Sequence, residues 1–275
     1  MKRIAAAIVV LPWLMVLPCI SGCVTTSEGD RPNILSTEEE IQLGQKMAAE
    51  VEKDEKRLNN SAVQTYVRKI GERLAQQSPR KDVPYEFTVI DNAEVVNAFA
   101  LPGGHMYAYT GLMKMCDNEA QLASVMAHEI GHVAAKHHGE TVTRQMGYQV
   151  IADIILGKSS PQRAQALAQL AANAAAMHFS REQEREADRL GMDFLFRAGY
   201  KPEAMVDFMR KLAQYEQAQG AGPQPRFLQF FASHPATVER IASLDALVQT
   251  YPLDLRNQSP TYFDRYKANV LDVLK

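Results

Sequence analysis

The feature that most constrains this chain is the pattern His-Glu-x-x-His at residues 128–132. On a helix, residues four positions apart lie on one face, so His128 and His132 can offer two neutral imidazoles to a single Zn²⁺ ion. Glu129 follows the first of them and is offset around the helix, so it can reach a metal-bound water without binding the metal. The pattern therefore predicts a helix that supplies two ligands of a catalytic zinc site and its general base.

The residues around this pattern fit a helix with one face in a core and the other face on a cavity. Opposite His128 on a helical wheel lies an apolar face, made of Leu122, Met126, Ile130 and Val133. Small or polar side chains surround His128 instead, namely Gln121, Ser124, Val125, His132 and Ala135. A chance occurrence of the pattern on a surface helix would show a charged face, so the flanking residues favour a zinc site.

A catalytic zinc typically takes three protein ligands and leaves one position for water. The best source of the third ligand is segment 180–188, which contains Glu182, Glu184 and Glu186. On a helical wheel, Glu184 and Asp188 share a face with small and apolar residues, whereas the other two glutamates share a charged face. Burying two carboxylates without partners would cost several kcal/mol, and a metal ion and a histidine N–H would remove that cost.

We therefore expect Glu184 to be the third zinc ligand. Asp188, one turn later, is expected to accept a hydrogen bond from the far nitrogen of a ligand histidine and to fix its tautomer. A buried salt bridge is the alternative role for Glu184. Glu182 and Glu186 are expected on a solvated face.

The remaining histidines give no comparable signal. His137 and His138 are expected to lie off the ligand face of the zinc helix, in solvent. His105 and His178 have no partner that the sequence reveals. None of the four is expected to bind the metal.

The amino terminus has the pattern of an export signal. The short basic start Met1-Lys2-Arg3 is followed by an apolar run from Ile4 to Pro18. The length of this run suits a signal-peptide core and is short for a membrane span. The run ends in Ile20-Ser21-Gly22-Cys23, which resembles the lipobox of bacterial lipoproteins. This predicts a lipoprotein signal peptide at 1–22, a lipid on Cys23 that attaches the protein to a membrane, and a flexible tether at 23–35. The alternative is an ordinary secretory signal with a small-residue cleavage site.

The resemblance to lipoproteins also indicates a location. Val24 and Thr25 follow the cysteine without an Asp, which by resemblance to sorted enterobacterial lipoproteins favours the outer membrane, on the periplasmic face of the bacterial envelope. If Cys23 carries the lipid and Cys19 is removed with the signal, Cys116 is the one free cysteine left, so no internal disulfide is expected and Cys116 should be a buried apolar residue. The net charge of −2 gives no electrostatic reason to expect nucleic acid as a partner.

The chain after the tether predicts an α+β domain at 36–250 that is mostly helical, followed by a C-terminal extension at 251–275. Two helices are expected first, from Ser36 to about 58 and from 61 to about 77. Three strands are expected next, at 85–90, 95–101 and 105–110, the last two joined by a tight turn at Pro102-Gly103-Gly104. From Glu119 onward the chain reads as nearly all helix.

Several breaks are expected within this helical part. Loops are predicted at 157–161 and 220–223, and Pro235 is expected to open the last long helix. The Ala-rich segment 165–179 is weakly patterned, and it can be either a core helix or a movable cover over the cleft.

These motifs together resemble a known family, the zinc peptidases of the HtpX and CAAX-type membrane proteases, in particular the Oma-like branch of periplasmic lipoproteins. The resemblance covers about residues 36–247. Beyond the zinc ligands it includes Asn97-Ala98-Phe99-Ala100, Pro102-Gly103-Gly104, Ser180-Arg181, Ala187-Asp188 and Ser233-His234-Pro235. The membrane spans of HtpX and CAAX proteases are missing, and the residues after 250 are too few for the tetratricopeptide array of some periplasmic relatives.

The resemblance implies a zincin-type (gluzincin) fold with a sheet of three to four strands beside the zinc helix. It also implies peptide hydrolysis by zinc-activated water, with one Zn²⁺ per chain and Glu129 as general base. The matching histidine of the family lies near the metal, so His234 is expected either to stabilise the oxyanion or to bind the zinc as a fourth ligand and hold the enzyme latent. The alternative is a histidine at a helix start with no catalytic part. Asn97 is expected to face the substrate or to be a plain turn residue.

Two functions of different classes remain open at this point. The first is an endopeptidase that cleaves unfolded or misassembled envelope proteins, with the substrate added as a strand to a sheet edge. The second is a latched, chaperone-like binding protein with little proteolytic activity. A non-peptidase zinc hydrolase would be recognised by a closed small-molecule pocket without an exposed sheet edge. Oligomers are possible, but the sequence does not indicate them.

Overall fold

The computed structural model describes residues 35–158, 160–219 and 233–275, all of which belong to the unit Pro32–Lys275. The predicted signal peptide at 1–22, Cys23, the tether up to residue 34 and the loop at 220–223 lie outside the described residues. The prediction of a mostly helical α+β fold is confirmed, with a sheet of three strands. The longer helices are α1 (Thr37–Asp54), α2 (Ser61–Ala75), α4 (Glu119–Ala134), α5 (His137–Met146), α7 (Pro161–Ala172), α8 (Arg181–Arg197), α9 (Glu203–Gln219) and α11 (Val238–Val248).

The first helix begins where the sequence predicts and ends earlier. The Ser36 side chain accepts a hydrogen bond from the Glu39 N–H, and the Glu39 carboxylate accepts one from the Ser36 N–H, which is a capping box. Instead of continuing to residue 58, α1 stops at Asp54 because the chain then runs along the sheet edge. There Arg57 forms a bridge with Ile90, and the Leu58 N–H donates to Val89 O.

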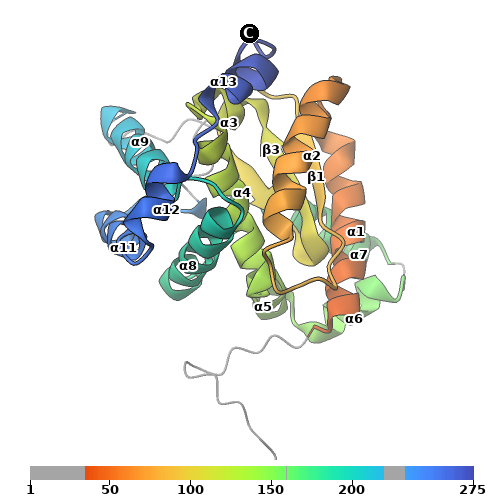
Figure 1. Ribbon diagram of the computed structural model, residues 1–275. Helices are drawn as coiled ribbons and strands as arrows, with labels where there is room; N and C mark the ends of the chain where they lie inside the picture. The colour runs from red at the N-terminus through yellow and green to blue at the C-terminus, as the bar shows by residue number, and fades with distance from the viewer. Residues whose placement is uncertain (1–34, 159, 220–232) are drawn as a thin grey trace, which may run out of the picture. The chain divides into compact units, whose positions relative to one another are not determined.

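The three strands form a sheet of order β1-β3-β2 (Figure 1). They comprise β1 (Glu86–Ile90), β2 (Ala98–Ala100) and β3 (His105–Tyr109). β1 pairs in parallel with β3, and β2 pairs antiparallel with β3, with Phe99 opposite Tyr107. The predicted turn between the last two strands is the short helix η1 (Pro102–Gly104), in which Gly103 has a φ of 74° that favours glycine. β2 is therefore an edge strand of the described sheet.

Helix α4, which carries the His-Glu-x-x-His pattern, lies at the centre of the described unit. Figure 1 shows it between α1, α2 and the sheet on one side and α8, α9 and α11 on the other. It packs against α2 and β2 as well as α8 and α9, and all its residues from Glu119 to Val133 are buried. The apolar face of α4 is therefore expected, because the helix contacts other elements on both sides and has little surface in water.

The helices after α4 are shorter than a continuous helical pattern would give. The short elements after α4 are α6 (Tyr148–Ile155), η2 (Ala174–Ala176), α12 (Leu253–Gln258), α13 (Phe263–Tyr266) and the π-helix η4 (Lys267–Leu271). Another short helix, α3 (Thr110–Met115), lies directly before α4 in the chain. The Ala-rich segment divides into α7, which packs on α1, and η2, which packs on β2. The expectation that Pro235 opens the last long helix is wrong: α11 begins at Val238, because Thr237 caps it by accepting from the Arg240 N–H.

The C-terminal residues are joined to the start of α4. The buried carboxylate of Glu119 accepts hydrogen bonds from the hydroxyls of Tyr66 and Tyr200 and from the guanidinium of Arg265. Tyr266 is fully buried and donates its hydroxyl hydrogen bond to Met113 O at 2.6 Å. The segment after residue 251 thus contributes to the same core as the zinc helix.

Cys116 is a buried free cysteine, as expected, and burial raises the pKa of its thiol. None of the helices described here combines the length and the apolar character that crossing a bilayer requires.

Candidate metal centre

Helices α4 and α8 carry the predicted ligands, and each begins at a side-chain cap. The Asn118 side chain caps α4 by accepting from the Gln121 N–H, and Ser180 and Gln183 form a capping box at the start of α8. These starts set the rotation of both helices. As a result, His128 and His132 on α4 face Glu184 and Asp188 on α8, and all four side chains are buried.

Two glycines let α4 and α8 approach closely enough for these side chains to meet. A Cβ atom on Gly131 would lie 2.7 Å from Ala187 O, and one on Gly191 would lie 2.9 Å from His128 N. Both distances are well inside van der Waals contact, and in each case the obstacle is backbone. Any larger residue would therefore push the helices apart and separate the ligands that they carry.

Four buried donor atoms converge at this crossing. One ligand atom each from His128, His132, Glu184 and His234 lies within 4.8 Å of the other three. Nε2 of His128 lies 3.1 Å from Nε2 of His132 and 3.3 Å from Nδ1 of His234. The carboxylate oxygens of Glu184 lie 3.5 Å from each of the two Nε2 atoms and 2.8 Å from Nδ1 of His234.

The donor set and its spacing fit a zinc ion. Zinc–nitrogen and zinc–oxygen bonds of about 2.0–2.2 Å place the ligand atoms of a tetrahedral site about 3.3–3.6 Å apart. Most of the distances above fall in or near this range. Burial lowers the pKa of His132 well below its ordinary value, which favours the neutral imidazole that binds a metal. In the part of the chain that the structure describes, Oε2 of Glu184 is buried and accepts no hydrogen bond.

Asp188 lies where its predicted role requires, and an arginine joins it. Oδ1 of Asp188 lies 3.0 Å from Nδ1 of His128, the nitrogen that points away from the cluster. Arg240, on α11, donates from Nε and Nη2 to the two oxygens of Asp188 at 2.8 and 2.7 Å. Its Nη1 also lies 2.8 Å from Oε2 of Glu184 in an ion pair without hydrogen-bond geometry. One guanidinium thus compensates the charge of both buried carboxylates.

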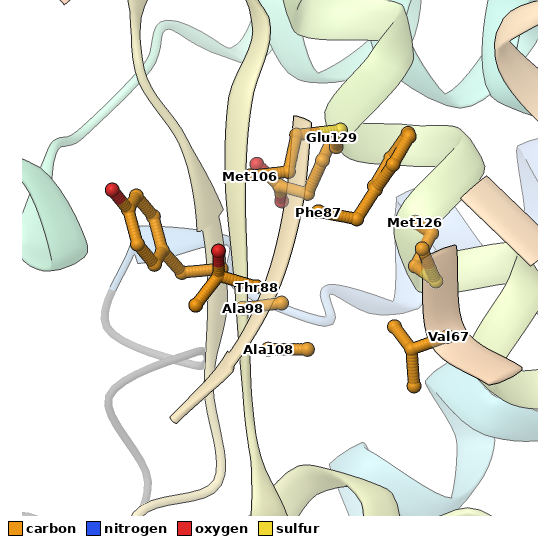
Figure 2. A pocket seen from close by; sticks show the side chains of 9 residues that line it. Val67, Phe87, Thr88, Ala98, Met106, Ala108, Met126 and Glu129 are labelled. Carbon is orange, nitrogen blue, oxygen red and sulfur yellow. The ribbon is translucent and has the colours of Figure 1, made fainter. Parts of the chain in front are cut away.

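Glu129 lies beside the cluster and outside its donor set. Its Oε2 accepts from the Ala100 N–H at 3.2 Å, and its Oε1 lies 3.5 Å from Nε2 of His234. Figure 2 shows Glu129 at a cavity of about 10 Å³ between the strands and α4, where its neighbours include Phe87 and Met106. Burial among such side chains raises the pKa of Glu129.

The structure corrects the placement of His137. It was expected in solvent, but it is fully buried, and its Nδ1 lies 3.0 Å from Nδ1 of His132. The reason is that α4 ends at Ala134 and Lys136 adopts a left-handed conformation with a φ of 61°, so that α5 starts in a new direction and turns His137 back toward His132. His138 is buried as well, contrary to expectation, and burial lowers its pKa to about 3.

The remaining sequence-predicted residues lie as follows. Nδ1 of His105 is 3.4 Å from Glu86, and His178 is exposed, so neither belongs to the metal cluster. Glu182 pairs with Arg185 on the outer face of α8, as expected for a solvated carboxylate. Glu186 is only partly solvated, because its Oε2 lies 3.4 Å from Nε2 of His137.

Asn97 precedes the edge strand β2 and is fully buried. Its side-chain amide donates to Ala175 O of η2 at 2.8 Å, while its Oδ1 has no hydrogen-bond partner among the described residues. The structure therefore places Asn97 beside the sheet edge, with its amide held by the Ala-rich segment. Phe179, at the end of that segment, lies against the rings of His132 and His234 at centroid distances of 4.0 and 5.7 Å.

Three residues of the site are absent from the sequence-based prediction. Arg240 could not be chosen among 30 Lys and Arg residues, although two buried carboxylates on one helix face do indicate a need for a cation. His137 was missed because the break at Lys136 leaves no clear signal in sequence. Phe179 reaches the site only through the packing of a segment distant in sequence.

Comparisons with curated proteins show similarity to bacterial and mitochondrial proteases. The "Beta-barrel assembly-enhancing protease" of Escherichia coli (strain K12) is 33% identical over 217 residues, which cover 76% of this chain and 43% of that protein. The "Putative beta-barrel assembly-enhancing protease" of Vibrio cholerae is 27% identical over 253 residues, covering 86% and 51%. The "Mitochondrial metalloendopeptidase OMA1" of Schizosaccharomyces pombe is 29% identical over 181 residues, covering 66% and 51%. The chain thus spans about half the length of the curated relatives it matches.

A family model agrees with these relatives. The model of peptidase family M48 matches residues 61–248, which is more than half of the chain. The matched range includes Glu129 and all four residues of the metal cluster. The chain therefore belongs to peptidase family M48, a family of zinc metallopeptidases.

Proposed function

We propose that this chain is a membrane-anchored, zinc-dependent endopeptidase that cleaves unfolded or misassembled proteins of the cell envelope. The observation that carries the proposal is the buried convergence of His128, His132 and Glu184, with the carboxylate of Glu129 directly beside it. When bound, a zinc ion supplies Lewis acidity, which makes water nucleophilic near neutral pH and polarises a scissile carbonyl.

Glu129 is the residue that moves the proton. Its raised pKa and its position outside the donor set suit a carboxylate that takes a proton from the attacking water and delivers it to the leaving amine. The hydrogen bond from the Ala100 N–H holds Oε2, which leaves Oε1 directed toward the cluster. The same hydrogen bond links the base to the edge strand β2.

His234 has two alternative roles, and the distances favour one of them. Its Nδ1 lies among the donors and its Nε2 faces Glu129, so it stands where the fourth zinc ligand would be. We propose that His234 would hold the zinc as that fourth ligand and so keep the enzyme latent. Stabilisation of the oxyanion by His234 is the alternative.

The edge strand β2 is the proposed place for the substrate backbone. A peptide that pairs with β2 would lie beside Glu129, and main-chain hydrogen bonds would bind it without a strong sequence preference. In the described conformation Asn97 is bonded to Ala175 there, so we propose that the substrate displaces this segment and takes over the Asn97 side chain.

The substrate class can be tested with one protein in two states. We expect the purified enzyme with zinc to cut an outer-membrane β-barrel protein at internal peptide bonds when that protein is diluted from urea. The same protein folded in detergent should stay intact, because its strands are already paired. Mass spectrometry of the fragments measures both outcomes. If the unfolded protein remains uncut while it binds to the enzyme, the latched chaperone-like function replaces the endopeptidase.

The membrane anchor rests on Cys23 and needs a separate test. The relatives named as β-barrel assembly-enhancing proteases suggest the envelope as the site of action, and the lipobox-like residues 20–23 suggest how the protein stays there. We expect Cys23→Ala to shift the protein from the membrane fraction to the soluble periplasmic fraction. Unchanged membrane association of this variant would refute the lipid anchor.

A further inference from the structure

The outer nitrogen of the metal ligand His132 faces a second histidine. Nδ1 of His132 lies 3.0 Å from Nδ1 of His137, and the ring centroids are 5.0 Å apart at an angle of 70°. Nε2 of His137 lies 3.4 Å from Oε2 of Glu186. The three side chains therefore form a row that starts at the metal cluster and ends at a partly exposed carboxylate.

Hydrogen-bond chemistry allows one arrangement of protons in this row when a metal is bound. A metal takes the lone pair of Nε2 of His132, so the proton of that neutral ring is on Nδ1, which must donate. The facing Nδ1 of His137 must then accept, which places the proton of His137 on Nε2. That N–H points at the carboxylate of Glu186, which in its ionised form accepts hydrogen bonds and donates none. Every donor in the row thus meets an acceptor.

The fold holds this row from two elements. His137 starts α5 after the left-handed Lys136, and Glu186 lies on α8, the helix that also supplies Glu184. The side chain of His137 is 0% exposed, whereas that of Glu186 is 38% exposed. The His137 ring is therefore shielded from water, while the carboxylate of Glu186 retains contact with water.

We propose that His137 is a positioning residue that fixes the tautomer and ring orientation of His132, and that Glu186 does the same for His137. This inference rests on the zinc site of the proposed function. His137 would thus do for His132 what Asp188, which faces the outer nitrogen of His128, does for His128. The two zinc-binding histidines would then be held in different ways, one by a carboxylate directly and the other by a histidine in between.

Zinc affinity of the full-length protein tests the proposal, measured by competition with a chromogenic chelator. We expect His137→Leu to weaken zinc binding about 10–100-fold, the usual effect of losing an outer hydrogen-bond partner of a metal ligand. His137→Asn should recover most of this loss, because Oδ1 of the asparagine lies near the position of the histidine Nδ1 and can still accept from Nδ1–H of His132. Glu186→Ala should weaken binding less than His137→Leu does. Asp193→Ala, which removes a similarly exposed carboxylate of α8, should leave it unchanged.

The comparison of the two His137 variants separates positioning from packing. Unfolding by urea in the absence of zinc reports the packing loss of each variant. If Leu and Asn weaken zinc binding equally, or if His137→Leu binds zinc as tightly as the wild type, the proposal is overturned. The affinity measurement needs no hydrolysis, so its result is independent of whether the protein proves to be a peptidase.

Discussion

Glu129→Gln should abolish hydrolysis while leaving the zinc site intact. Loss of a general base typically costs about 10²–10⁴-fold in rate, and the amide cannot take up the proton. The amide oxygen can still accept from the Ala100 N–H, and Glu129 is outside the donor set, so fold and metal content should be kept. The measurement is the initial rate of cleavage of an unfolded protein, with zinc determined in the same samples.

A matched control for this variant is Glu182→Gln. Glu182 lies on α8 with a half-exposed side chain that pairs with Arg185, and it should tolerate the change without loss of rate. If Glu129→Gln cleaves as fast as Glu182→Gln at equal zinc content, another group is the base. If it has lost its zinc, Glu129 supports the site instead of moving the proton.

Arg240→Met should cause a large loss of stability. Removal of the guanidinium leaves the buried carboxylates of Glu184 and Asp188 without their shared cation, and breaking such a buried pair typically costs about 3–5 kcal/mol. Methionine keeps much of the length and apolar surface of the stem, so the effect reports the charge. The measurement is the free energy of unfolding in urea, with the metal removed by a chelator.

Arg210 provides the control for Arg240. It contacts both oxygens of Asp245 at 2.7 and 2.6 Å, in a pair whose side chains are 47% and 43% exposed. Because water solvates that pair, Arg210→Met should cost at most about 1 kcal/mol. Equal losses for the two variants would contradict the role assigned to Arg240. Added zinc should restore part of the stability of Arg240→Met, since a cation bound in the cluster compensates the same charges.

The sequence alone leads to a candidate site residue where that residue depends on local spacing. His128, Glu129 and His132 are placed by a single helix, and the choice of Glu184 over Glu182 and Glu186 followed from one helix face. The three strands and the turn at Pro102–Gly104 were also predictable, because short runs rich in apolar and aromatic residues and a Pro-Gly-Gly turn indicate them locally. His234 was expected near the metal only because of the family resemblance.

The parts that were not predicted depend on how distant elements meet. The helix after His132 ends because Lys136 adopts a left-handed conformation, a choice that lysine does not reveal in sequence and that moves His137 from solvent to the metal site. Arg240 reaches Asp188 from α11, a helix that starts at Val238, three residues later than Pro235 suggested. Tertiary packing decides both features.

The central claim is that one zinc ion is bound by His128, His132 and Glu184, and it is tested most directly by a crystal structure of the zinc-loaded protein with anomalous diffraction at the zinc edge. The account predicts a single anomalous peak bonded to Nε2 of both histidines and to a Glu184 oxygen, with His234 or water as the fourth ligand. A protein that takes up no zinc, or a peak held by other residues while these three side chains stay unbound, would contradict it.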